Sequence, residues 1–508
     1  MFRAFQYSHC SITLMVLAIF SWGSFTADGQ SPPGAYKDVK AYPEGPAGER
    51  VKELIEVVNN TDPQRVRKFV EEAFTPEFRD FAPMEQHLEV FADFARSTGG
   101  VEFYGVRNYT EPRPDGSLVV ILRAKLTEDW RAFVLNIEQE SPHRIERLQF
   151  APARPPSDLP PASKLNEKEL TAELGKYLDR MSAADTFSGT VLLTKDGKVL
   201  FQGAYGQADK NFGVVNKLDT KFNLGSMNKM FTSTAIMQLM EQGKLKLTDT
   251  LADHVGNSWL PEEVARQITI EQLLTHTSGL GSYFNDKFFE MSREKLREVD
   301  DYKPLVADER PQFEPGTQWA YSNTGMLLLG AVIEISSGQN YFEYIRKNIY
   351  EPAGMINSDC YDLDRVIPNL AIGYTRVSDA GGAHWETNTF KHVIRGGPAG
   401  GGYSTVEDLQ RFAQAMRTGK LVGKASTEKM WTATELSQRG RGPGYGFGFG
   451  VSMTPAGRVV GHSGGFPGIS SVLQMYLDSG FTLAVMSNYD GGAPMVQQKV
   501  TELLGRME

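Results

Sequence analysis

The chain has only two cysteines in 508 residues, Cys10 and Cys360. If the N-terminal segment that carries Cys10 is removed, one cysteine is left, and no intramolecular disulfide can form even in an oxidising compartment. The fold must therefore be stabilised by packed apolar cores. A chain of this length with 41% hydrophobic residues has ample material for them.

Excess positive charge and the common cofactor motifs are also missing. With 53 basic and 62 acidic residues the net charge is −9, and there is no basic stripe or tail. This balance argues against nucleic acid and anionic membrane surfaces as partners. No His-Glu-x-x-His or paired Cys-x-x-Cys spacing occurs, so we expect no metal site and no cofactor. The glycine-rich Gly396–Gly402 lacks the Gly-Lys-Ser/Thr ending of a phosphate loop and is interpreted as a flexible turn beside a cleft.

The N-terminal apolar run, residues 12–20, is too short to span a bilayer, which takes about 20 residues. It follows Arg3 and precedes small residues at 27–29, a pattern typical of a secretory signal peptide over residues 1–29. The sequence therefore predicts a secreted or periplasmic protein. An uncleaved leader that anchors the chain to a membrane is the alternative.

Proline-rich segments predict the domain boundaries. Residues 30–48 are expected to form a linker, and residues 151–163 a second, stiffer one. Between them, residues 49–150 predict an accessory α+β domain, with helices at 49–59, 63–73 and 84–97 before strands at 101–109, 118–126, 131–139 and 143–150. This segment weakly resembles the cone-shaped nuclear-transport-factor-like domains. Nothing in it has site-like spacing, so we interpret it as a packing or dimerisation module.

Residues 164–508 form the predicted main domain. A hairpin is expected around Asp196-Gly197, and two terminal strands, 469–477 and 481–486, precede a final helix near 495–504. The helix that opens at Ser226 is apolar nearly all round and should be buried centrally. We expect an α+β fold, with an antiparallel sheet flanked by helices, an all-helical insertion from Thr248 to about Ser358, and a cleft where the two meet.

The segment Ser226-Met227-Asn228-Lys229 lies where a strand-like run gives way through Gly225 to that helix. Positions i and i+3 share a helix face, so the Lys229 amine can reach the Ser226 hydroxyl, and the helix N-terminus favours developing negative charge. An amine in an apolar pocket has a lowered pKa and can act as a base. The pattern predicts acyl transfer through a serine ester.

The same tetrapeptide pattern occurs twice more, at Ser292/Lys295 and at Ser426/Lys429. Both lie in polar surroundings that are typical of solvated helix faces, so we interpret them as decoys. The assignment of Ser226 therefore depends on partner residues elsewhere in the chain.

Two later motifs supply such partners. Tyr321-Ser322-Asn323 follows a turn and precedes an apolar helix, which would place a phenol and an amide at the site edge. A second Tyr-x-Asn, at 283–285, has no helix signature directly behind it, so we rank it below Tyr321-Ser322-Asn323 as a candidate site motif. His462-Ser463-Gly464-Gly465 lies on a strand, where an imidazole and backbone amides would line one wall of the cleft. Small residues there let a substrate lie against the strand like a pairing peptide.

A rival interpretation is the Gly-x-Ser-x-Gly nucleophile elbow, which Gly461–Gly465 also matches. That elbow needs a helix straight after the serine and a histidine later in the chain. No histidine follows Ser463, and the next segments read as strands. We therefore rank this alternative low.

Taken in order, Ser-x-x-Lys, Tyr-Ser-Asn and His-Ser-Gly resemble the class C β-lactamase and penicillin-binding-protein-like serine hydrolases, over about residues 165–508. The stretches 273–280, 315–323 and 398–405 fit the same family. The resemblance implies that Ser226 is the nucleophile, that Lys229 and Tyr321 form its base, and that Asn323 orients the substrate or Lys229. The backbone N–H groups of Ser226 and Gly465 would form the oxyanion hole, with Ser463 and Gly464 binding substrate.

The resemblance also implies that His462 stands where lactamases commonly have lysine. An imidazole with a reference pKa of about 6.5 is mostly neutral at pH 7. We therefore expect a preference for uncharged esters, which should shift toward carboxylate-bearing substrates as the pH falls through the titration of His462.

Three functions remain open. The first is an acyl-serine hydrolase of esters, small amides or D-amino-acid peptides, with a small-molecule or peptide substrate. The second is a β-lactamase or D-alanyl-D-alanine carboxypeptidase. The third is a catalytically inactive penicillin-binding-like scaffold, which would have no need of Ser226, Lys229, Tyr321 and His462 together.

Overall fold

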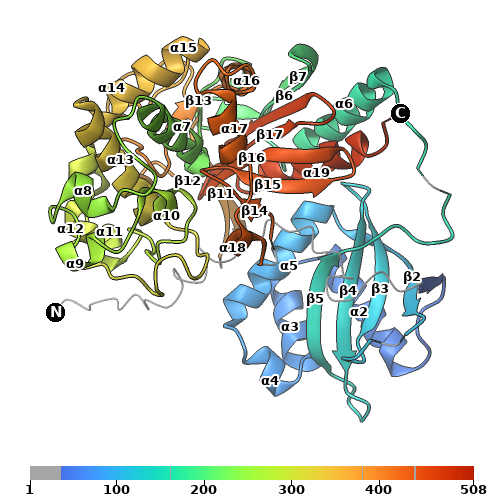
Figure 1. The fold of residues 1–508 in the computed structure, drawn as a ribbon. Coiled ribbons are helices and arrows are strands. Elements are labelled where there is room, and N and C mark those ends of the chain that lie inside the picture. The colour runs from blue at the N-terminus through green and yellow to red at the C-terminus, as the bar shows by residue number, and fades with distance from the viewer. Residues whose placement is uncertain (1–35, 112, 161, 380–381, 440–441, 508) are drawn as a thin grey trace. The chain divides into compact units, whose positions relative to one another are not determined.

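The computed structural model describes residues 36–507 except 112, 161, 380–381 and 440–441 (Figure 1). The predicted signal peptide, residues 1–29, and the first part of the predicted linker, 30–35, lie outside the described residues. The described chain folds into two compact units. One comprises 36–164 together with Asp179–Thr186, and the other comprises Leu165–Leu178 and the chain from Phe187 onward. Among these residues, no helix has both the length and the apolar character needed to cross a bilayer.

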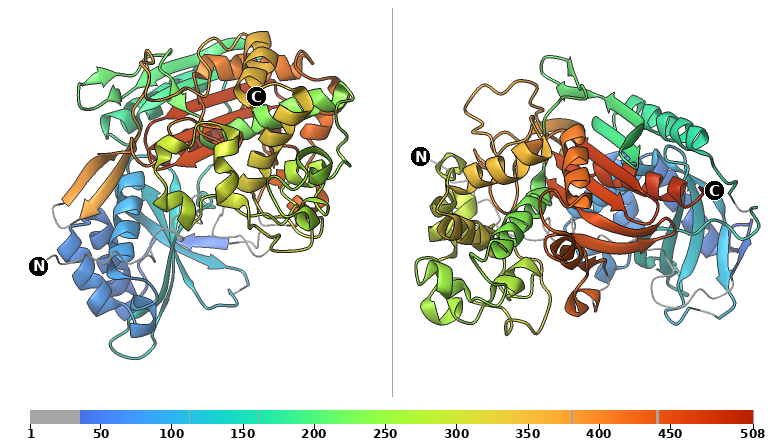
Figure 2. Two further views of the ribbon diagram at one scale, coloured as in Figure 1. Left: turned by 90° about the vertical axis from the view of Figure 1, so that its left-hand side faces the viewer. Right: turned by 45° about the horizontal axis from the view of Figure 1, so that its top comes forward.

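After a short first strand, the N-terminal unit has helices and then the remaining strands of an antiparallel sheet, and the helices precede these strands as the sequence predicts. The helices are α2 (Pro46–Asn59), α3 (Pro63–Ala73), α4 (Pro76–Arg79) and α5 (Met84–Thr98). The sheet has the order β1-β2-β3-β4-β5, formed by Tyr36–Val39, Val101–Tyr109, Leu118–Ala124, Trp130–Ile137 and Ile145–Pro152. Helices α2, α3 and α5 lie on one face of the sheet (Figure 2), where Leu54, Val70 and Phe91 share a core with Phe133.

Strand β1 corrects the prediction of a linker over residues 30–48. Its residues pair antiparallel with β2, with Val39 opposite Val106. The Asp38 carboxylate accepts a hydrogen bond from Arg107 at 2.9 Å, and both side chains are fully buried. A four-residue strand among prolines and glycines is too short to show alternation, and its ion-pair partner is remote in sequence. The linker prediction was therefore wrong for residues 36–39, and α2 already begins at Pro46.

The C-terminal unit is built on a seven-stranded antiparallel sheet of order β14-β15-β16-β17-β18-β6-β7. The strands are Gly444–Tyr445, Gly450–Thr454, Gly457–Phe466, Ile469–Tyr476, Phe481–Ser487, Gly189–Lys195 and Lys198–Tyr205. The predicted hairpin is confirmed, since Asp196 and Gly197 connect β6 to β7 with φ values of 49° and 80°, as a two-residue turn favours. Strand β18 pairs with β6 and so joins the C-terminal strands to this hairpin.

Helices and short strand pairs surround the sheet. Helix α19 (Gly492–Leu504) packs on β17 and β18, and α16 (Val406–Arg417) packs on β18 and β6. Helix α6 (Glu167–Ala183) opens the unit, and α17 (Lys424–Met430) and α18 (Glu435–Gln438) precede β14. The short pairs are β8 (Gln207–Asp209) with β9 (Val214–Val215), β10 (Phe222–Asn223) with β13 (Tyr403–Ser404), and β11 (Tyr374–Asp379) with β12 (Gly382–Thr387).

The predicted helical insertion is present. Residues 248–358 contain helices and turns but no strand, namely α8 (Leu251–Val255), α9 (Glu262–Ala265), α10 (Ile270–Leu274), α11 (Asp286–Glu290), α12 (Lys303–Val306), α13 (Asn323–Ser337), α14 (Tyr341–Ile345) and α15 (Glu351–Ala353). Helix α7 (Asn228–Glu241) packs against α13 and is buried on every side through Leu239. The fold class predicted from the sequence, an antiparallel sheet flanked by helices with a helical insertion, is confirmed.

Candidate active site

The candidate nucleophile lies in a tight corner between β10 and α7. Ser226 sits in a 3₁₀ turn, Gly225–Met227, so the regular helix begins two residues later than predicted, at Asn228. Gly225 has a φ of +50°, and a Cβ there would lie 2.9 Å from Cα of Gly464 and from the backbone nitrogen of Gly465. A glycine at this position therefore lets strand β16 approach the turn that carries Ser226.

Lys229 lies in the first turn of α7 and has no exposed surface. Its Nζ donates hydrogen bonds to Oδ1 of Asn323 at 2.9 Å and to the carbonyl of Ala399 at 2.5 Å, and it lies 4.8 Å from the ring centroid of Tyr321. Both hydrogen-bond partners are neutral. Burial lowers the pKa of the Lys229 amine well below its ordinary 10.5, because no carboxylate compensates for the lost water. The uncharged amine, which can accept a proton, is thereby favoured.

Tyr321 stands immediately before α13. Burial raises the pKa of its phenol, and a hydrogen bond with the Ser226 side chain partly opposes that rise. The phenol is therefore protonated at neutral pH and close enough to Ser226 to exchange a proton with it. The ring also packs on the imidazole of His276, at 4.5 Å between centroids.

Asn323 links this group to the loop before α11. While its Oδ1 accepts from Lys229, its Nδ2 donates to Oγ of Ser282 at 3.1 Å. Oγ of the neighbouring Ser322 donates to the Gly281 carbonyl at 2.9 Å and caps α13 by accepting from the Gly325 N–H. The amide is thus held in one orientation by partners on two sides.

His462 lies on β16 behind the cleft wall. It is only 6% exposed and is not among the described side chains that line the cleft, contrary to the prediction. Its Nδ1 donates to the Ser463 carbonyl at 2.5 Å, and its Nε2 accepts from the Tyr445 hydroxyl at 3.1 Å. Burial, with a smaller effect from nearby Lys229, lowers the pKa of His462 from 6.5 to about 3. The expectation of an imidazole that titrates near pH 6.5 is therefore wrong.

The glycines of β16 have different surroundings from those predicted. A Cβ on Gly464 would lie 1.9 Å from the Leu224 carbonyl oxygen, so this residue packs against the nucleophile segment rather than leaving room for a substrate. Gly465, in contrast, lines the same cleft as Ser226. Strand β15 pairs with β16 only as far as Gly461, so the described sheet leaves Ser463–Phe466 without a partner strand on that side. The backbone there is available for an extended substrate.

The nucleophile-elbow alternative is excluded by the position of Ser463. This serine lies inside β16 opposite Val472 of β17, and the chain after it turns directly into that second strand. A nucleophile elbow requires a sharp strand-to-helix turn at the serine. Ser463 therefore lacks the geometry of an elbow nucleophile.

The other two Ser-x-x-Lys matches are not among the described residues that line this cleft. Ser292 is exposed at the start of a short 3₁₀ turn, as predicted. Ser426 is buried, contrary to the prediction, and its hydroxyl donates to the Glu241 carboxylate. Lys429 forms an ion pair with Glu271 at 3.3 Å. Ser426 and Lys429 are thus each bound to a different carboxylate and not to each other.

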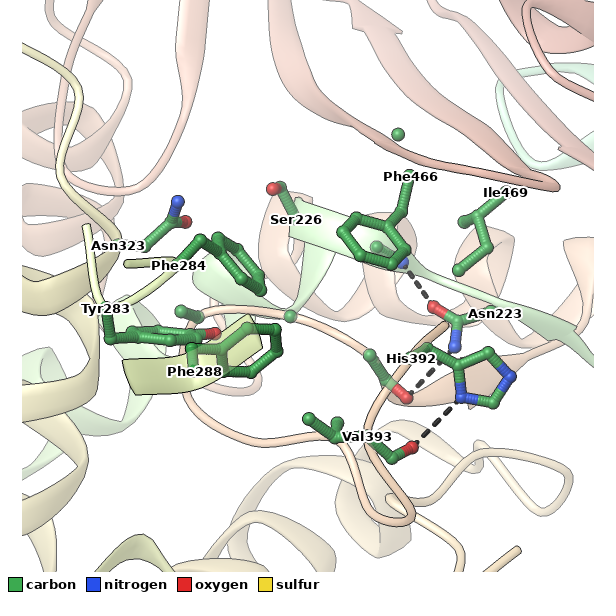
Figure 3. Close-up of a pocket in the computed structure, with 15 residues that line it drawn as sticks. Asn223, Ser226, Tyr283, Phe284, Phe288, Asn323, His392, Val393, Phe466 and Ile469 are labelled. Atoms are coloured by element: carbon green, nitrogen blue, oxygen red, sulfur yellow. Dashed lines mark hydrogen bonds between the residues drawn. The ribbon is translucent and has the colours of Figure 1, made fainter. Parts of the chain in front are cut away.

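The cleft itself is a partly open cavity of about 540 Å³, including space open to solvent, with Ser226 at its edge (Figure 3). Its lining comes from the nucleophile turn with Asn223, the loop before α11 with Phe288, Asn323 at the start of α13, the segments 392–393 and 399–401, and the end of β16 with the start of β17. The loop residue Tyr283 was ranked low in the sequence, where no helix was expected behind it. In fact Asn285 caps α11 by accepting from the Phe288 N–H at 3.1 Å.

Several site residues were missed in the sequence. The Ala399 carbonyl binds Lys229, and the Asn228 side chain accepts from the Gly402 N–H at 3.1 Å, which ties the glycine-rich segment to α7. His276 accepts from the Ser322 N–H through Nδ1 at 3.2 Å and has a φ of +60°, rare for a residue with a side chain. The sequence signal that could have identified His276 is its position inside Leu273–Leu280, one of the stretches that resemble the family. Within the described residues no group of three metal-ligating side chains occurs.

The comparisons with known proteins agree with this geometry. Residues 174–504 match the family model Beta-lactamase, which covers more than half of the chain. The chain therefore belongs to the β-lactamase family of hydrolases, and the resemblance inferred from the motifs is confirmed.

The chain is also similar to individual proteins of known name or structure. The chain is 34% identical to penicillin-binding protein 4* of Bacillus subtilis (strain 168) over 317 residues, which cover 59% of this chain and 68% of that protein. A solved penicillin binding protein from Bacillus halodurans is 29% identical with a TM-score of 0.57, covering 67% of this chain and 99% of that one. A D-stereospecific amidohydrolase from Streptomyces sp. is 29% identical with a TM-score of 0.55, covering 65% and 97%.

Proposed function

We propose that the protein is a serine hydrolase that acts on carboxylic esters or on small amides and D-amino-acid peptides through an acyl-serine intermediate. Ser226 attacks the carbonyl carbon while the neutral Lys229 amine accepts its proton. The phenol of Tyr321 delivers a proton to the leaving group. The backbone N–H groups of Ser226 and Gly465 stabilise the oxyanion, and water then hydrolyses the acyl-serine by the reverse proton transfers.

The single observation that carries this proposal is the environment of Lys229. A fully buried lysine without a carboxylate partner costs stability, because the interior disfavours its charge. Asn323 and the Ala399 carbonyl hold it beside Tyr321, and Tyr321 contacts the Ser226 hydroxyl. A strongly perturbed titratable group in a cleft supports a catalytic role. A scaffold without activity would gain nothing from this arrangement.

The alternative substrates are β-lactams and D-alanyl-D-alanine peptides, since two of the relatives are named penicillin-binding proteins. The amidohydrolase relative supports the leading proposal, because its name describes hydrolysis of D-configured amides. The described lining of the cleft includes no Lys or Arg that could meet a carboxylate, which also favours uncharged substrates.

A rate comparison tests the proposal. Purified protein is assayed with p-nitrophenyl butyrate, nitrocefin and a D-alanyl-D-alanine peptide, with Ser226→Ala as the inactive control and Ser463→Ala as the matched control. We expect the butyrate ester to be the fastest of the three and the Ser226→Ala rates to fall to background. Faster turnover of nitrocefin or the peptide by decades would replace the ester proposal with its alternative. No turnover of any of them would support the scaffold.

For location we propose export to the periplasm or the cell exterior, on the basis of the leader-like residues 1–29. N-terminal sequencing of the protein recovered from the producing cells tests this. A mature N-terminus near residue 30 is the expected result, and an intact Met1 in a membrane fraction would indicate the uncleaved anchor.

A further inference from the structure

Two phenylalanines from different elements stack on each other in the cleft beside Ser226. Phe284 belongs to the loop before α11, and Phe466 ends β16 directly after Gly465. Their rings are stacked, with centroids 5.7 Å apart and an angle of 27° between the planes. Figure 3 shows Ser226 beside these two rings. Because Phe466 adjoins Gly465, a group held by this pair lies next to the reacting carbonyl.

The loop that carries Phe284 is bonded to Asn323 of the candidate site and to Glu309. Ser282, two residues earlier, accepts a hydrogen bond from Asn323, and Glu309 accepts one from the Gly281 N–H at 2.6 Å. The ring of Phe284 also packs against Phe288, at 4.8 Å between centroids. The ring of Phe284 is therefore held in a fixed position relative to Lys229 and Ser226, because its loop is bonded on both sides.

The remainder of the described lining carries no permanent charge. Its apolar members include Phe288, Val393 and Ile469, and its polar side chains are amides, phenols or imidazoles. Asn223 is occupied, since it accepts from the Gly225 N–H and donates to the Gly401 carbonyl. Burial lowers the pKa of His392, which favours its neutral form.

The described lining includes no Lys or Arg, and two cations near the cleft, Arg293 and Lys229, are bound by other groups. The guanidinium of Arg293 lies 4.3 Å from the ring centroid of Phe288 and donates to the backbone carbonyls of Phe288 and Met291. The Lys229 amine is buried and bonded to Asn323 and Ala399. A substrate carboxylate would lose water in this cleft without meeting a cation, which disfavours its binding.

From these observations we propose that the preferred acyl group bears an uncharged aromatic side chain, held against the stacked rings of Phe284 and Phe466. This inference rests on the proposed function and specifies its substrate class. Aromatic rings bury a large area and favour offset stacking on other rings.

The test uses p-nitrophenyl esters that share one leaving group and differ in the acyl part: acetyl, 3-phenylpropionyl and succinyl. Rates are divided by those of hydroxide hydrolysis. We expect kcat/KM for the 3-phenylpropionyl ester to exceed that for the acetyl ester roughly tenfold or more, and the succinyl ester to be the slowest. Phe284→Ala and Phe466→Ala should each reduce the phenylpropionyl-to-acetyl ratio several-fold. Phe212→Ala, at a residue that is 83% exposed, is the control that should leave it unchanged.

A binding measurement separates this inference from the proposed function. Ser226→Ala keeps the cleft but lacks the nucleophile, so calorimetry with 3-phenylpropionamide and with succinamate reports the pocket alone. Tighter binding of 3-phenylpropionamide, with no hydrolysis by the wild type, would support the aromatic pocket and overturn the proposed function. Equal hydrolysis of all three esters would overturn the pocket. Phe466→Leu covers the case in which Phe466→Ala does not fold, and it should lower the ratio less.

Discussion

The hydroxyl of Tyr445 donates a hydrogen bond to Nε2 of His462 at 3.1 Å, while Nδ1 of the same imidazole donates to the Ser463 carbonyl. Both ring nitrogens are thus engaged, and the tautomer with hydrogen on Nδ1 is fixed. Because the pair is buried, the imidazole is neutral down to a pKa of about 3. His462 therefore supports β16 as a neutral group, and its charge cannot select substrates at working pH.

The first prediction concerns pH. Selectivity between a neutral and a carboxylate-bearing ester should stay constant from pH 7.5 to 5.5, because His462 does not gain a proton in the folded protein over that range. In the unfolded chain, His462 gains a proton below about pH 6.5. As the pH is lowered below that value, the free energy of unfolding should therefore decrease by up to about 1.4 kcal/mol per pH unit for this residue. Urea midpoints at pH 7, 6 and 5 measure this.

His462→Asn is the matched variant for that prediction. It lacks the titrating group, so its stability should fall less steeply between pH 6.5 and 4 than that of the wild type. Buried His276, whose pKa burial also lowers, keeps part of the slope in both proteins. A substrate preference that changes with an apparent pKa near 6.5 in the wild type and not in the variant would contradict the neutral assignment.

The second prediction is that Tyr321→Phe lowers kcat by roughly two to four decades, the range typical of general acid–base groups. The variant keeps the ring that packs on His276 and removes only the hydroxyl, so its fold should be unchanged. Steady-state assays with p-nitrophenyl butyrate measure kcat, and circular dichroism is the control for the fold. An unchanged kcat would remove Tyr321 from the proton transfers.

The third prediction concerns Gly464. A methyl group there would lie 1.9 Å from the Leu224 carbonyl oxygen, so Gly464→Ala should push β16 away from the nucleophile turn. We expect a loss of about 1–3 kcal/mol of stability and a fall in kcat/KM. Gly450→Ala is the control, because a methyl group at that position would meet only the Gly461 carbonyl oxygen at 3.6 Å. If both variants behave alike, close packing at Gly464 does not position Ser226.

The fourth prediction is that a protein truncated to begin at Pro160 folds and hydrolyses small activated esters. All candidate catalytic residues lie in the C-terminal unit. Truncation removes the Leu126 carbonyl and the Glu128 carboxylate that bind Arg180, so Arg180→Ala in the full chain is the control for that loss. Soluble, folded but inactive truncated protein would show that residues 36–159 complete the site.

Much of the fold was predictable because local patterns agree with it. Proline at the start of α3, the Asp-Gly turn between β6 and β7, and the alternation of the terminal strands all predict elements at nearly the observed bounds. Ser226 and Lys229 were found because their spacing follows helix geometry. Tyr321 was found because it directly precedes a capped, apolar helix.

The parts of the fold and of the candidate site that could not be predicted depend on contacts between residues remote in sequence. The Ala399 carbonyl reaches Lys229 across 170 positions, and no side-chain pattern distinguishes one backbone carbonyl from another. The burial of His462 follows from Tyr445 on a two-residue strand, which is too short to recognise. Phe284 and Phe466 meet only because the helical insertion packs beside the sheet. Such pairings arise from tertiary structure and have no local sequence signal.

Labelling tests the central claim, that Ser226 is the acylated residue, most directly. The protein is treated with a fluorophosphonate, and the adduct is located by intact mass and peptide mapping, with Ser226→Ala, Ser463→Ala and Ser292→Ala in parallel. One adduct on Ser226, lost only in Ser226→Ala, is the result that the account predicts. An adduct on Ser463 or Ser292, or labelling that persists in Ser226→Ala, would contradict it.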